Sequence, residues 1–195
     1  TQNATAGEEW RRGWHPERFT RASQPNNVLV VGGGPAGLEA ALIAAKQGFE
    51  VTIAEQTDDW GGRVLQESQL PGMATWRRVR DYRVWALSQM GNVSMYANSE
   101  LDAEAALSFG ADHIAVATGA RWTKRLYSAL EIPAAPLDLP QIFTPEDVFA
   151  GTISGDRVLV FDYDNYYLGG VIAEHLAEQG KAVSYSTPAG HASAW

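Results

Sequence analysis

Short apolar runs alternate with longer segments of helical spacing along most of this chain. Residues 28–31 are continuously apolar, as expected for a parallel strand buried on both faces. The expected strands are 28–31, 51–54, 93–96, 113–117, 158–161 and 183–185. The expected helices are 35–47, 76–90, 103–109, a turn at 145–150, and a segment carrying Leu168, Val171, Ile172 and Leu176 at helical spacing. Residues 56–73 and the proline-containing stretch 121–140 are expected to be loop, so the pattern predicts an α/β fold with a parallel sheet.

The strand–helix–strand pattern occurs twice. It predicts a Rossmann-like FAD/NAD(P)-binding domain over residues 25–140 and the start of a second, nested Rossmann-like domain over 141–195. The second stretch is too short to complete a domain, so the chain is expected to be truncated there. Residues 1–24 are polar and rich in Trp and Arg, with one helical turn expected at 6–12.

A glycine-rich turn follows the first apolar strand. Gly32, Gly34 and Gly37 form the pattern G-x-G-x-x-G, with Pro35 and Ala36 opening the next helix. The first glycine permits the tight turn, the second lets a pyrophosphate approach the backbone, and the third lets the helix pack closely on the sheet. The helix N-terminus then offers free N–H groups and partial positive charge to phosphates.

An acidic residue completes this motif. Glu55 ends the second strand, about 20 residues beyond the glycines, where a carboxylate binds the ribose hydroxyls of a dinucleotide. A carboxylate there repels a 2′-phosphate, so we expect no NADP at this site. The alternative is a tight turn without a ligand and a solvated Glu55.

Two further motifs fall where a bound dinucleotide would pass. Gly62 and Arg63, with Gln56 in the same loop, follow the acidic strand end, and Thr118 and Gly119 follow the strand at 113–117. In an open α/β sheet, ligands bind outside the carboxyl ends of the strands. Together the three motifs resemble flavoproteins with two dinucleotide-binding domains, a group that includes glutathione reductase. That resemblance implies FAD, whereas spacing alone predicts only ADP or a dinucleotide.

The turn of the second unit departs from this pattern. Residues 162–169 read Asp-Tyr-Asp-Asn-Tyr-Tyr-Leu-Gly, without the two glycines of a phosphate turn. Two carboxylates would repel an anion there. We interpret this unit as a Rossmann-like scaffold that has lost nicotinamide binding. Tyr163, Tyr166 and Tyr167 are alternatively the lining of a specialised pocket, or packing residues.

Composition and charge narrow the classes of protein and of binding site that this chain can represent. The formal charge of −8 argues against a nucleic-acid partner, the apolar runs are too short to span a membrane, and no cysteine is present to form a disulfide or bind a cluster. No signal peptide is recognisable, so we expect a cytoplasmic protein. The four histidines have no metal-ligand spacing, and we predict neither a metal site nor a catalytic residue within this chain. The arginines at 77, 78, 80 and 83 either border another part of the protein or pair with nearby acids.

The opening residues 1–9 and the run Arg-Arg-Gly-Trp-His-Pro-Glu at 11–17 resemble the trimethylamine and dimethylamine dehydrogenase family. Further runs at 70–72, 80–83, 110–112 and 117–122 extend the likeness over essentially the whole chain. The resemblance implies a larger oxidoreductase that N-demethylates a methylated amine, with FMN on an N-terminal TIM barrel and a 4Fe-4S cluster next to it. This chain would then be its ADP- or FAD-binding segment, with residues 1–24 as the connecting segment that leaves the cluster.

The family resemblance also implies partners. Electrons would pass to an electron-transferring flavoprotein, and the complete protein is expected to form a homodimer. An NAD(P)H-dependent reductase of the 2,4-dienoyl-CoA reductase type and a non-catalytic nucleotide-binding module stay as alternatives. Under each hypothesis we expect the chain alone to lack catalytic activity.

Overall fold

The computed structural model describes residue 10 and residues 20–124, 139–163 and 166–192. Two compact units can be distinguished, one formed by residues up to 65 together with 76–119, the other by 66–75 together with 120 onward. Each is described by itself below. The domain bounds expected from the sequence stay a prediction, and most of the helical turn expected at 6–12 lies outside the described residues.

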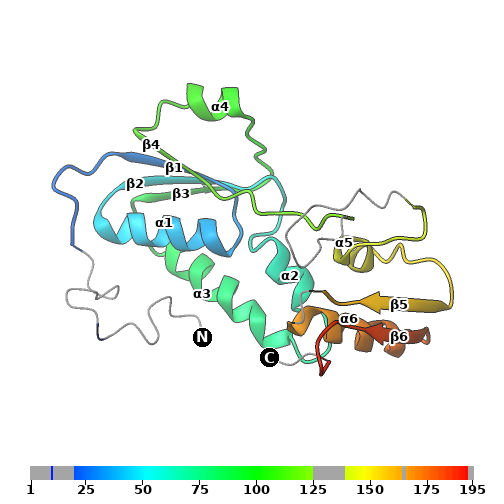
Figure 1. Ribbon diagram of the computed structural model, residues 1–195. Coiled ribbons are helices and arrows are strands. Elements are labelled where there is room, and N and C mark those ends of the chain that lie inside the picture. The colour runs from blue at the N-terminus through cyan, green and yellow to red at the C-terminus, as the bar shows by residue number, and fades with distance from the viewer. Residues whose placement is uncertain (1–9, 11–19, 125–138, 164–165, 193–195) are drawn as a thin grey trace. The chain divides into compact units, whose positions relative to one another are not determined.

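The first unit is built on a four-stranded parallel sheet with the order β3-β2-β1-β4. Figure 1 shows α1 and α3 on one face of this sheet and α4 on the other. The elements are β1 (Asn27–Val31), α1 (Pro35–Gln47), β2 (Glu50–Ala54), α3 (Arg77–Ser88), β3 (Val93–Tyr96), α4 (Ala103–Ser108) and β4 (His113–Val116). This arrangement confirms the predicted α/β class.

Helix α1 has the bounds that its sequence predicts. Pro35 occupies the first turn, where a missing N–H costs little, and Gly48 ends the helix in the left-handed conformation. Its inner face carries Leu38, Ala41, Leu42 and Ala45, which are buried with Val30, Val51 and Ile53 of the sheet and Leu87 of α3. Burial of these side chains holds the start of α1 at the end of β1.

The opposite face of the sheet packs against α4. Asp102 caps this helix by accepting a hydrogen bond from the backbone N–H of Ala105 at 2.8 Å. Leu29 and Val31 of β1 are buried together with Ala106.

The loop expected at 56–73 is wrong in part. Residues Arg63–Glu67 form the helix α2, and a 3-10 turn, Ala74–Trp76, precedes α3. Val64, Leu70 and Met73 are buried, so apolar anchoring makes this stretch regular although glycines and aspartates precede it.

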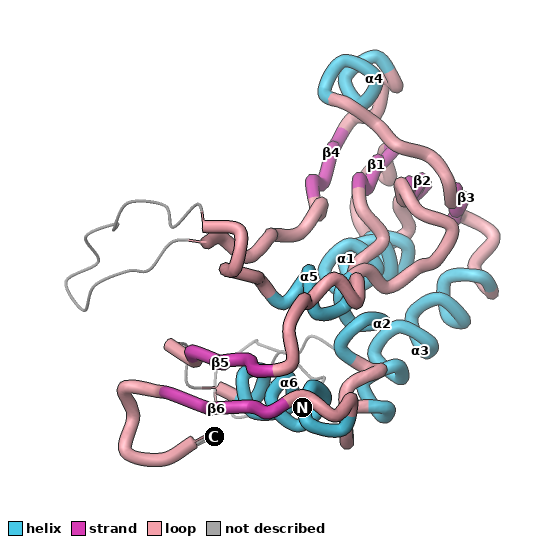
Figure 2. The backbone as a smooth tube through the Cα atoms, turned by 90° about the vertical axis from the view of Figure 1, so that its right-hand side faces the viewer, coloured by secondary structure: helices cyan, strands magenta, loops and turns pink. Residues whose placement is uncertain are grey.

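The second unit contains α5 (Pro145–Phe149) and two parallel strands, β5 (Arg157–Phe161) and β6 (Ala182–Ser186), joined by α6 (Tyr167–Glu178). Figure 2 shows α6 packed along this strand pair. Its core consists of Val148, Leu168, Ile172 and Leu176 together with Leu70 and Met73, which come from the separate segment 66–75. None of the described helices is long and apolar enough to cross a membrane.

Candidate nucleotide site

The turn between β1 and α1 forms an open niche. Gly32 has a φ of 107°, which favours glycine, and its N–H donates to the carbonyl of Ala54 at 2.8 Å. A Cβ added at Gly34 would meet no atom within 4 Å. Among the described residues, nothing accepts from the backbone N–H groups of Gly34, Ala36 and Gly37. Open space and free N–H groups at the positive end of a helix fit a phosphate group.

Glu55 lies directly after β2 and is only 6% exposed. Its Oε2 accepts from the backbone N–H of Gly33 at 2.6 Å, while its Oε1 accepts from the N–H and the hydroxyl of Thr57, both at 2.9 Å. The alternative of a solvated Glu55 is therefore wrong. Because a carboxylate accepts about four hydrogen bonds, roughly one acceptor site is left for a ribose hydroxyl.

A strap formed by Trp60, Gly61 and Gly62 crosses the phosphate turn. The N–H of Gly61 donates to the carbonyl of Gly33 at 2.8 Å. A Cβ on Gly62 would lie 3.4 Å from the Cα of Gly34, and one on Gly33 would lie 2.5 Å from Cε3 of Trp60. The strap thus contacts the glycine turn directly, and the predicted second motif lies beside the first.

The end of β4 adjoins the same turn. The N–H of Ala117 donates to the carbonyl of Val31 at 2.8 Å, and a Cβ on Gly32 would lie 3.1 Å from the backbone nitrogen of Thr118. Thr118 and Gly119 are exposed. The structure therefore brings together all three glycine motifs, although their contact with a ligand stays a prediction.

The other predicted site residues are less central. Gln56 is exposed, and Arg63 is half-buried at the first position of α2. Of the clustered arginines, Arg80 contacts the strap through its Nε, which donates to the carbonyl of Trp60 at 2.9 Å. Arg83 instead pairs with Glu39 of α1 at 2.6 Å. Within the described residues, no group of histidines and carboxylates is arranged to hold a metal ion.

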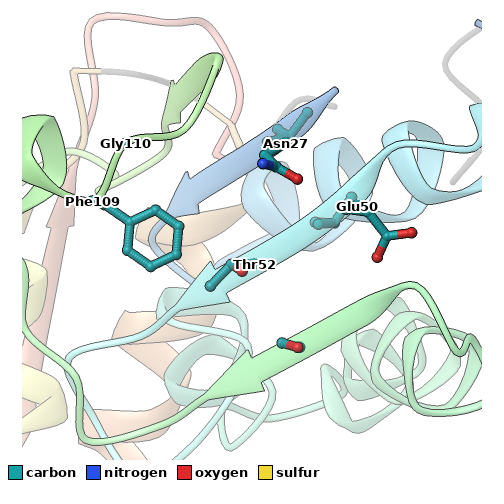
Figure 3. Close-up of a pocket in the computed structure, with 8 residues that line it drawn as sticks. Asn27, Glu50, Thr52, Phe109 and Gly110 are labelled. Carbon is teal, nitrogen blue, oxygen red and sulfur yellow. The ribbon is translucent and has the colours of Figure 1, made fainter. Parts of the chain in front are cut away.

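A separate hollow of about 270 Å³ opens on the α4 side of the sheet. Figure 3 shows the ring of Phe109 over this face beside Thr52, with Asn27 and Glu50 further along the strands. Asn27 and Glu50 are the first residues of β1 and β2. The hollow therefore lies at the amino ends of the strands, whereas ligands of such sheets bind at the carboxyl ends.

In the second unit, the side chain of Asp162 fills the turn that corresponds to the phosphate turn. Gly37 is the sixth residue after β1, while Gly169 is the eighth after β5, so this turn is longer. A Cβ on Gly169 would lie 2.5 Å from Cγ of Asp162. Asp162 is 6% exposed and accepts a hydrogen bond from the hydroxyl of Tyr185. A buried carboxylate thus lies at the start of α6, which accords with the absence of a glycine turn there; residues 164 and 165 of the predicted turn lie outside the described part.

The tyrosines of that turn differ in burial and in contacts. Tyr163 and Tyr166 are 44% and 53% exposed, whereas the hydroxyl of Tyr167 donates to Oε2 of Glu67 at 2.9 Å. The rings of Tyr166 and Tyr167 lie edge to face, with their centroids 5.2 Å apart. Tyr167 therefore makes packing contacts, and a pocket lined by the three tyrosines stays a prediction.

Comparisons with known proteins agree with this geometry. A family model described as pyridine nucleotide-disulphide oxidoreductase matches residues 5–138. The chain belongs to this family. It is 37% identical to dimethylamine dehydrogenase of Hyphomicrobium sp. (strain x) over 97% of this chain and 27% of that protein. The resemblance to the trimethylamine and dimethylamine dehydrogenases is thereby confirmed.

Solved structures and a further relative extend the match. The structure of 6-hydroxypseudooxynicotine amine oxidase from Pseudomonas geniculata N1 covers 100% of this chain, with a TM-score of 0.92 and 46% identity, and 29% of that protein is matched. NADH oxidase of Thermoanaerobacter brockii is 34% identical over 94% of this chain and 27% of its own length. The chain therefore spans under a third of the length of these oxidoreductases.

Several contacts of the site could not be read directly from the motif. Gly33, Thr57 and Trp60 were not among the predicted residues, yet all three contact the glycine turn or Glu55. The available signal was a fourth glycine, Gly33, between the first two motif glycines, together with a tryptophan just before the second motif.

Proposed function

We propose that this chain is the nucleotide-binding segment of a larger flavoprotein that oxidises a methylated amine. ADP, or the ADP part of FAD, lies in the first unit. The amine is oxidised in another part of the polypeptide that carries FMN, and the electrons leave through a 4Fe-4S cluster to an electron-transferring flavoprotein. The complete protein is a cytoplasmic homodimer in this proposal.

The residues of the first unit fit an adenine nucleotide. The open face of Gly34 and the N–H groups of Gly34, Ala36 and Gly37 would hold the pyrophosphate, and Glu55 would accept from the ribose. Gly62, Thr118 and Gly119 border the same niche. When bound as FAD the group supplies a redox-active ring, whereas ADP supplies binding energy only.

The observation that carries the proposal is the contrast between the two turns. The first unit keeps an open glycine turn, while in the second Asp162 is buried against Gly169 and hydrogen-bonded to Tyr185. A phosphate placed there would meet a buried negative charge. The second unit is therefore unsuited to NAD(P)H. This favours an enzyme that receives electrons from an amine and passes them to a protein.

A second candidate is an NAD(P)H-dependent flavin reductase of the 2,4-dienoyl-CoA reductase type. The similarity to the NADH oxidase of Thermoanaerobacter brockii favours it. A third is a segment whose nucleotide serves only folding or docking.

Anaerobic titration of the complete polypeptide separates these candidates. Loss of the oxidised flavin absorbance with dimethylamine or trimethylamine, and not with NADH, is expected. Rapid reduction by NADH would select the reductase instead. Amine turnover that persists in a Gly34→Val variant lacking its nucleotide would give the nucleotide a structural role. Chromatography of the nucleotide released on denaturation identifies ADP or FAD.

A further inference from the structure

We propose that Arg80 is a positioning residue of the nucleotide site, which holds the strap of Trp60, Gly61 and Gly62 against the phosphate turn. The inference rests on the proposed adenine nucleotide in the first unit and adds a residue outside the glycine motifs. Arg80 lies on α3, far from the turn in sequence, and no contact with the ligand itself is assigned to it.

A single peptide group links Arg80 to the turn. The carbonyl of Trp60 accepts from Nε of Arg80 at 2.9 Å, and the N–H of the same peptide group, that of Gly61, donates to the carbonyl of Gly33 at 2.8 Å. Because a trans peptide is planar and its C=O and N–H point in opposite directions, the group acts as a rigid spacer. Arg80 therefore fixes the direction in which the Gly61 N–H points.

The stem of Arg80 packs under the strap as well. A Cβ added at Gly61 would lie 2.8 Å from Cγ of Arg80 and 3.2 Å from its Cβ, and Gly61 has a φ of 120°. Gly61 is buried. Both the side-chain stem and the Nε thus define the position of the strap.

The strap in turn fixes the backbone of Gly33, which lies next to the phosphate niche. Its carbonyl is held by Gly61 and its N–H by Oε2 of Glu55. With both backbone groups fixed, the following residue, Gly34, keeps its open face and free N–H before the ligand arrives. Preorganisation of this kind increases affinity by lowering the ordering cost of binding.

The guanidinium charge is the less important part of Arg80. Nη1 pairs with Asp81 at 2.8 Å, and the two side chains are 24% and 51% exposed. Exposed ion pairs contribute little to stability. The hydrogen bond from Nε should therefore matter more than the charge.

Arg83, one turn further along α3, provides an internal contrast. Its Nε pairs with Glu39 of α1 and its Nη1 donates to the carbonyl of Val79, so these polar contacts join two helices and do not involve the strap. A variant of Arg83 should change the stability of the unit but not the discrimination between ligands with and without phosphate.

The test compares Arg80→Met with Arg80→Gln in the complete polypeptide. Both side chains are neutral and reach a similar distance, but only glutamine places an N–H at the position of Nε. The protein is freed of nucleotide, and calorimetry measures the dissociation constants of ADP and adenosine, with Arg83→Met as control. Arg80→Met should weaken ADP about tenfold, the loss of one hydrogen bond, and adenosine much less, while Arg80→Gln stays near the parent protein.

Each of the other possible outcomes of these binding measurements contradicts one step of the proposal. Equal losses in the Met and Gln variants would show that the charge, not the Nε hydrogen bond, is important. Equal weakening of ADP and adenosine, as for a general loss of stability, would reduce Arg80 to a packing residue. An unaltered Arg80→Met also refutes the positioning role. A parent protein that binds neither ligand overturns the proposed nucleotide function itself, and the positioning role with it. If Arg80→Met does not fold, the ADP-to-adenosine ratio of Arg80→Gln and Arg80→Lys decides, since a donor near the Nε position should preserve it.

Discussion

Replacement of Gly33 by alanine is expected to strain the phosphate turn, although the two residues differ by one methyl group. The added Cβ would lie 2.5 Å from Cε3 and 2.9 Å from Cζ3 of Trp60, and 3.0 Å from Cβ of Glu55. Carbon atoms in favourable contact are about 3.5–4.0 Å apart. The indole ring or the turn must therefore move by up to about 1 Å, and overpacking of this kind costs about 1–3 kcal/mol.

Hydrogen exchange measured by mass spectrometry reports this cost locally, which suits a chain with two compact units. Peptides covering β1 and the start of α1 should exchange about 5- to 150-fold faster in Gly33→Ala, the equivalent of that free energy. Gly34→Ala is the matched control, because a Cβ there meets no atom within 4 Å. Its ligand-free exchange should match that of the parent protein.

A double-mutant cycle isolates the contact with the indole. Trp60→Leu retains the backbone of the strap but removes the ring that the new methyl group would strike. Gly33→Ala should therefore cost at least about 1 kcal/mol less in the Trp60→Leu background than alone, as expected for residues in contact. Additive effects would refute the reasoning, because the clash would then lie elsewhere.

Three further predictions concern the two turns. Gly34→Val should leave the sheet folded but weaken ADP by about 10- to 100-fold through lost contacts to phosphate, as calorimetry would show; undiminished binding would move the site elsewhere. Glu55→Gln should weaken ADP by a similar factor, about 10- to 100-fold, because an amide cannot accept from Gly33 and Thr57 on both sides. Glu50→Gln, exposed at the start of β2, is its control, and equal affinities in the two variants would contradict the role of Glu55. Asp162→Ala should destabilise the second unit by about 1–3 kcal/mol, since the hydroxyl of Tyr185 loses its acceptor, without permitting flavin reduction by NADH. Faster reduction by NADH in that variant would show that Asp162 alone excludes the dinucleotide.

Much of the first unit follows from local sequence. The strands β1 and β2 are apolar runs, α1 is bounded by Pro35 and Gly48, and Asp102 caps α4. Each of these signals acts within a few residues, so the order of elements and the position of the glycine turn could be predicted. The short helix α2 was missed because the glycines before it indicate a loop, whereas buried Val64 and Leu70 hold the segment in place through distant contacts.

The contacts that complete the site act over longer distances. Arg80 was recognised as one of several clustered arginines, but its bond to Trp60 spans 20 residues and the pair of Arg83 with Glu39 spans 44. Spacing along the chain cannot separate these two roles. Likewise the acidic turn at 162–169 indicated a lost phosphate site, while the bond between Asp162 and Tyr185 depends on the pairing of β5 with β6.

The membership of residues 66–75 in the second unit has a consequence for how such proteins can be cut and recombined. The backbone passes from one unit to the other three times, after residues 65, 75 and 119. A continuous segment from 120 onward would lack Leu70 and Met73 from its core and Glu67 from its bond to Tyr167. The second unit is therefore not one continuous segment that a gene fusion could transfer by itself. A chimaera that exchanges it should carry residues 66–75 from the same parent.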